Sequence, residues 1–118
     1  MKAVSPERQT LLIKSMQSTL SKLEHAYENM IEKGTNASLV KKRLDAVKIA
    51  LDSLKNAWHG AEFSYEKENI LEARKVITGI LPSVEKQYGH AKEGSPQKTL
   101  LERRIASIEA AIEALDAH

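Results

Sequence analysis

Apolar residues recur at alternating spacings of three and four along four segments of this 118-residue chain. Such spacing places apolar side chains on one stripe of an α-helix and leaves polar residues on the other faces. The pattern predicts helices over about 6–33, 37–59, 65–93 and 96–118. The four stripes are Ile13, Met16, Leu20, Leu23, Tyr27 and Met30; Val40, Leu44, Val47, Leu51, Leu54 and Trp58; Ile70, Ala73, Ile77, Leu81, Val84, Tyr88 and Ala91; and Leu101, Ile105, Ile108, Ile112 and Leu115.

Capping residues separate these segments. Ser5-Pro6 and Gly94-Ser95-Pro96 combine a side chain that accepts free amide protons with a proline suited to the first helical turn. Gly34 and Gly60 can adopt the left-handed conformation that ends a helix. Ser64 is the expected cap of the third helix. Because the connections within each pair of helices are short, the helices of a pair are expected to run antiparallel.

The third segment contains Gly79 and Pro82 within its apolar pattern. Proline lacks an amide donor and crowds the carbonyl four residues earlier, so a kink or short break is expected between Thr78 and Pro82.

The chain also contains an internal repeat with an offset of 61 positions. Residues 38–54 (SLVKKRLDAVKIALDSL) match residues 99–115 (TLLERRIASIEAAIEAL), with identity at Leu39/Leu100, Arg43/Arg104, Ala50/Ala111 and Leu54/Leu115. The repeated unit is a helical hairpin, about 5–59 and about 64–118. The sequence therefore predicts an all-α fold: one domain, 1–118, forming an antiparallel up-down-up-down four-helix bundle. We expect a slim rod about 42 Å long with both hairpin turns at one end.

Composition limits the chemistry. There is no cysteine, and no apolar run approaches the length of about 20 residues that spans a bilayer. No serine lies in a Gly-x-Ser-x-Gly elbow, and no histidine follows an acid by three residues as in di-metal bundles. We therefore expect no catalytic residues, no metal site and no cofactor. The chain start lacks the apolar stretch of a signal peptide, so the expected location is the cytoplasm, with signal-independent export left open.

Two short motifs resemble known families. The string His90-Ala91-Lys92-Glu93-Gly94-Ser95 resembles the phosphorylation motif of histidine phosphotransfer domains, which are also helical bundles. In that family the helix continues past the motif, whereas Gly94-Ser95-Pro96 predicts a helix end here. Trp58-His59-Gly60 resembles the turn of small exported helical hairpins of the WXG type. The Tyr-x-x-x-Asp/Glu export signal of that family is absent.

Charge is the most informative surface feature. The chain has 18 Lys and Arg against 16 Asp and Glu. In the expected rod, basic residues collect at the end with both turns and acidic residues at the other. The candidate partner-binding residues are Lys41, Lys42, Arg43, Lys98, Arg103 and Arg104.

These patterns favour a non-enzymatic interaction or adaptor protein whose basic end binds an acidic protein partner. A WXG-type exported protein is the alternative. A nucleic-acid-associated protein ranks lower, because the net charge is only +2 and aromatic residues are few. A phosphotransfer-like domain also ranks lower, because the lysine of its motif sits one position early and a helix end is expected at Gly94-Ser95-Pro96. The sequence leaves both monomer and dimer open.

Overall fold

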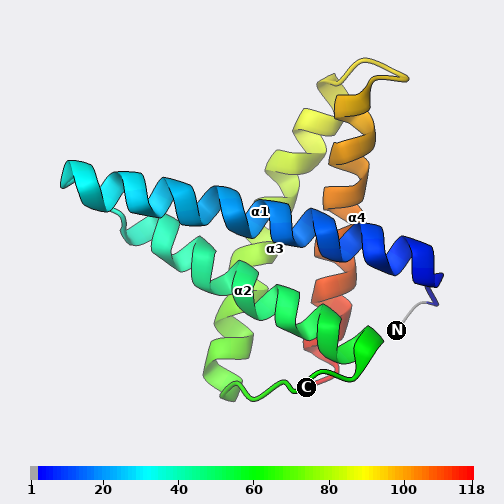
Figure 1. The fold of residues 1–118 in the computed structure, drawn as a ribbon, viewed down its shortest axis with the longest axis horizontal. Helices are drawn as coiled ribbons and strands as arrows, with labels where there is room; N and C mark the ends of the chain where they lie inside the picture. Colours follow the sequence, from blue (N-terminus) through cyan, green and yellow to red (C-terminus); the bar gives the residue numbers. More distant parts are fainter. Residues whose placement is uncertain (1–2) are drawn as a thin grey trace.

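Four helices make up the fold (Figure 1), as the sequence predicts. The structure, a computed structural model, describes residues 3–118. Its helices are α1 (Pro6–Lys33), α2 (Ser38–His59), α3 (Lys67–His90) and α4 (Pro96–Asp116), and residues 3–118 contain no strand. The all-α, four-helix prediction is confirmed.

The predicted caps begin and end most of these helices. Ser5 and Ser95 accept hydrogen bonds from the backbone amides of Arg8 and Lys98, at the starts of α1 and α4. Gly34 and Gly60 end α1 and α2 with φ angles of 71° and 66°, a region that L-residues with a side chain rarely adopt.

The third helix differs from the prediction at both ends. Its cap is Glu66, because the Ser64 hydroxyl donates to Glu62 Oε1 instead of capping α3. It ends at His90, before Gly94, which lies in the following turn. Helix α3 runs through Pro82 without a break, so the expected interruption is absent. A bend at Pro82 stays a prediction.

The core draws on all four apolar stripes. Met16, Leu54, Ile77 and Leu115 are among the most deeply buried large side chains, one from each helix. Trp58 packs against this core from the last turn of α2.

Short side chains mark the contact between α2 and α4. The Cα atoms of these two helices come within 8 Å of each other, whereas those of α1 and α3, both described over their full length, do not. Short side chains let two helix axes approach closely. Each of the two helices has three buried short side chains at positions related by the 61-residue offset, all at most 3% exposed: Ala46, Ala50 and Ser53 on α2, and Ser107, Ala111 and Ala114 on α4.

The two hairpins cross instead of lying along one axis, and the expected slim rod is wrong. Figure 1 shows α1 and α2 running across the view and α3 and α4 running from top to bottom. The molecule measures 43 × 40 × 20 Å, which is the shape of a flat cross. An ion pair gives evidence of the crossing: Lys42 Nζ lies 3.5 Å from Glu72 Oε1, and both residues are in the early turns of their helices, α2 and α3. In a rod these positions would lie about 18 Å apart along the axis.

None of the helices within residues 3–118 is both long enough and apolar enough to cross a membrane.

Candidate anion-binding notch between crossing helices

The six predicted partner-binding residues lie on two separate arms of the cross. Lys41, Lys42 and Arg43 are in the first turns of α2, next to the turn after α1. Lys98, Arg103 and Arg104 are in the first turns of α4, next to the turn after α3. Figure 1 places these two turns at different corners of the molecule. The expectation that both basic clusters share one end is therefore wrong.

Ion pairs occupy three of the six residues. Lys41 Nζ lies 2.8 Å from Asp45 Oδ1, Lys42 Nζ lies 3.5 Å from Glu72 Oε1, and Lys98 pairs with Glu93. Hydrogen bonds to Asp45 and Glu93 raise the pKa of Lys41 and of Lys98 above its ordinary value. Their charges are already balanced locally. Within residues 3–118, Arg43, Arg103 and Arg104 have no ion-pair partner.

Helix α1 crosses α4 at a contact held by two polar interactions. The buried Ser107 hydroxyl donates to the Leu12 carbonyl at 2.8 Å. One turn away on each helix, Arg8 donates two hydrogen bonds to Glu102, and the Glu102 hydrogen bond is the largest cause of a raised Arg8 pKa. This pair links the two helices at the crossing. It also occupies the carboxylate that precedes Arg103 and Arg104 in the sequence.

A notch of about 180 Å³ opens where the middle of α1 diverges from the start of α4. We name it the α1/α4 notch. Four of its lining residues are basic, two carry hydroxyls, two are leucines and none is acidic. They are Leu11, Lys14, Ser15, Ser18 and Lys22 of α1, and Leu100, Arg103 and Arg104 of α4.

These four cations are not neutralised by the chain. Within residues 3–118, Lys14, Lys22, Arg103 and Arg104 form no ion pair and no side-chain hydrogen bond. Like charges gathered in one concave site raise the local positive potential and attract anions.

Arg104 adds a more specific signal. Its Nε atom is shielded from solvent and has no hydrogen-bond acceptor in the described part of the chain. A buried donor without a partner costs roughly 1–3 kcal/mol, more when the group is charged. Nε itself is closed to an incoming anion, so an anion in the notch would bind the terminal Nη atoms of the same guanidinium.

The corresponding surface between α2 and α3 is neutralised. A smaller notch there is lined by Lys42 and Glu72, which form the ion pair described above. Subtracting the 61-residue offset from Glu72 gives Leu11, and adding it to Lys42 gives Arg103. The same two repeat positions thus hold an ion pair on one side of the molecule and an unpaired arginine beside a leucine on the other. Of these two surfaces, as described within residues 3–118, the α1/α4 notch is the one whose basic side chains have no ion-pair partner.

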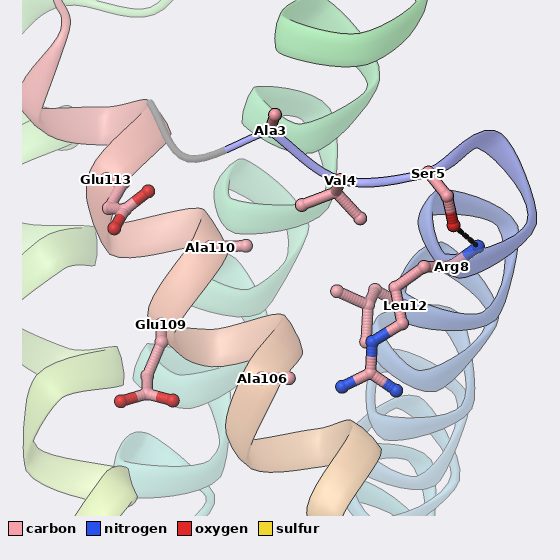
Figure 2. A pocket seen from close by; sticks show the side chains of 9 residues that line it. All are labelled: Ala3, Val4, Ser5, Arg8, Leu12, Ala106, Glu109, Ala110 and Glu113. Carbon is pink, nitrogen blue, oxygen red and sulfur yellow. Dashed lines mark hydrogen bonds between the residues drawn. The ribbon is translucent and has the colours of Figure 1, made fainter.

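A larger cavity of about 480 Å³ lies on the other side of the crossing, beneath the segment before α1. Its walls include the small side chains of Ala106 and Ala110, together with Arg8, Glu109 and Glu113. Figure 2 shows that the charged ends of these three side chains do not converge on one point. Arg8 is also bound to Glu102. Among the described residues, the charged side chains of this cavity therefore do not form a converging set (Figure 2).

Sequence reasoning identified the arginines of the notch but missed Lys14 and Lys22. Both lie on a face of α1 outside the apolar stripe, with Leu11, Ser15 and Ser18. Their spacing was visible in the sequence. The crossing that brings them beside α4 was not.

Comparisons with protein-family models, with curated proteins and with solved structures found no match for this chain. Within residues 3–118, no three metal-ligating side chains come together in a group that could hold an ion. The function has to be inferred from the chain's own geometry.

Proposed function

We propose that this chain is a non-enzymatic adaptor that binds an acidic protein partner through the α1/α4 notch. The observation that supports this proposal is the set of four cations in one concave site, Lys14, Lys22, Arg103 and Arg104, none of them paired within residues 3–118. Unpaired charged groups that are hydrated lower the stability of the free protein little. When they meet a surface of opposite charge, they contribute favourably to the free energy of binding.

Of the six expected partner-binding residues, the proposal keeps the two that line the notch, Arg103 and Arg104. Lys41, Lys42 and Lys98 already have acidic partners, so a bound protein would have to displace those carboxylates. Arg103 and Arg104 need no such exchange. The leucines at the notch, including Leu100 at 54% exposure, add apolar area beside the charges, as in a protein contact surface.

The test compares two triple variants that change the same repeat positions and the same charge. One replaces Lys14, Arg103 and Arg104 with Gln, and the other replaces their offset equivalents Lys75, Lys42 and Arg43. Each purified chain is immobilised and challenged with lysate of the native host at low and moderate salt, after circular dichroism has established that the helices persist.

We expect the first variant to retain at least about tenfold less partner than the parent chain, because its contacts to the partner's carboxylates are lost, while the control variant retains most of it. Equal losses in both variants would contradict the notch and indicate a diffuse basic surface. Retention of polynucleotide instead of protein would contradict the adaptor function itself.

A further inference from the structure

The α1/α4 notch contains more hydrogen-bond donors than a carboxylate can use. We infer that it binds a phosphoryl group carried on a side chain of the protein partner. This inference rests on the proposed function and specifies the group recognised. It starts from the donor chemistry of Arg103, Arg104, Lys14 and Lys22, with Ser15 and Ser18 beside them.

The donor count favours a phosphoryl group. A guanidinium presents five N–H donors, an ammonium three and a hydroxyl one. A carboxylate has two oxygens and one negative charge. A phosphorylated side chain has three terminal oxygens and a charge of about −1.5 to −2 near neutral pH. Two arginines, two lysines and two hydroxyls with no lining acid match the larger charge and the larger number of acceptors.

Arg104 can bind such a group through paired hydrogen bonds. Its Nε is buried and lacks an acceptor within residues 3–118. Arginine binds phosphate through two parallel N–H···O bonds, a geometry that lysine cannot reproduce. Because Nε is shielded, a phosphoryl group would meet the two terminal Nη atoms of Arg104 and leave its remaining oxygens for Arg103 and the lysines.

The size and edges of the notch indicate what kind of molecule carries the phosphoryl group. The volume of about 180 Å³ accommodates one phosphoryl group and the end of the side chain that carries it. It is too small to enclose a whole α-helix or a nucleic-acid duplex. Leu11 and Leu100 flank the cations and can contact apolar residues on either side of the modified one. The part of the notch within residues 3–118 has no aromatic residue on which a nucleic-acid base could stack.

The experiment uses the full chain and three fluorescein-labelled heptapeptides that differ only at the central residue, which is phosphoserine, glutamate or serine, flanked by alanine and leucine. Binding is followed by fluorescence anisotropy at moderate salt. We expect the phosphoserine peptide to bind roughly tenfold more tightly than the glutamate peptide, and the serine peptide to bind least. Arg104→Lys keeps the charge but should bind the phosphoserine peptide about tenfold more weakly, with circular dichroism used to check that its helices persist. The matched change Arg43→Lys should have little effect.

Three outcomes would overturn the inference, and they are distinguishable from failure of the proposed function. Equal binding of the phosphoserine and glutamate peptides would leave an acidic-partner adaptor without phosphoryl selectivity. Competition by inorganic phosphate at the same concentration as the phosphopeptide would indicate a free-anion site. Displacement of the peptide by a single-stranded oligonucleotide at lower concentration would indicate a nucleic-acid site.

Discussion

Tyr65 lies in the extended segment between α2 and α3, where its hydroxyl donates a hydrogen bond to Asp52 Oδ2. Burial first, and the Asp52 carboxylate second, raise the pKa of Tyr65 from 10.0 to about 12. A raised pKa in the folded state means that the proton is held more tightly after folding. The stabilisation is therefore complete below pH 10 and is lost as the pH rises toward 12. We predict a fall of about 1–2 kcal/mol in the free energy of unfolding over that window.

Tyr65→Phe provides the control for this prediction. It removes the titrating group, so its free energy of unfolding should change less between pH 10 and 12 than that of the parent chain. An ultraviolet titration of the parent should show a late tyrosine ionisation step near pH 12, and Tyr65→Phe should lack that late step. If the late step persists in Tyr65→Phe, the assignment to Asp52 and burial is wrong.

The contact between α2 and α4 depends on side-chain size. Ala111 has no exposed surface and belongs to the short side chains of this contact. Ala111→Leu should force the helices apart, lowering the free energy of unfolding by about 1–3 kcal/mol in a urea titration. Ala57→Leu, at an exposed position of α2, adds the same atoms and should change it by no more than about 0.5 kcal/mol. Equal effects of the two substitutions would argue against a size-limited contact.

At the level of single helices, most features could be predicted from the sequence because local rules determine them. Caps at Ser5 and Ser95 and stops at Gly34 and Gly60 depend only on nearby backbone groups. The start of α3 was misplaced because Ser64 had a competing local acceptor, Glu62. That competition depends on the conformation of the linker, which the periodicity of the helices does not report.

At the level of the whole molecule, the apolar stripes did not determine how the hairpins meet. A stripe specifies which face of a helix is buried, but it sets neither the crossing angle nor which residues of two helices come opposite each other. Those depend on the sizes of the packed side chains, such as the short residues Ala50 and Ala111. The solvent-accessible Arg8–Glu102 and Lys42–Glu72 pairs accompany the crossing and contribute little to it. The notch follows from this crossing. Arg103 and Arg104 could be selected from sequence by charge, whereas their neighbours Lys14 and Lys22 could be assigned only after the helices were placed.

The crossing of the two hairpins predicts two distances, one long and one short. The chain has no cysteine, so nitroxide labels can be placed at chosen pairs without removing native thiols. Labels at Thr35 and Glu93, one in each hairpin turn, should lie well beyond the roughly 8–10 Å that separates packed helices, because Figure 1 places those turns at different corners. Labels at Lys42 and Glu72, whose charged groups meet in the structure, should lie close together.

A slim rod requires the opposite result, with the turns adjacent and the Lys42–Glu72 positions about 18 Å apart along the axis. Pulsed electron–electron double resonance on the two labelled pairs distinguishes these arrangements. A short Thr35–Glu93 distance together with a long Lys42–Glu72 distance would support the rod and contradict the notch, which depends on the crossing.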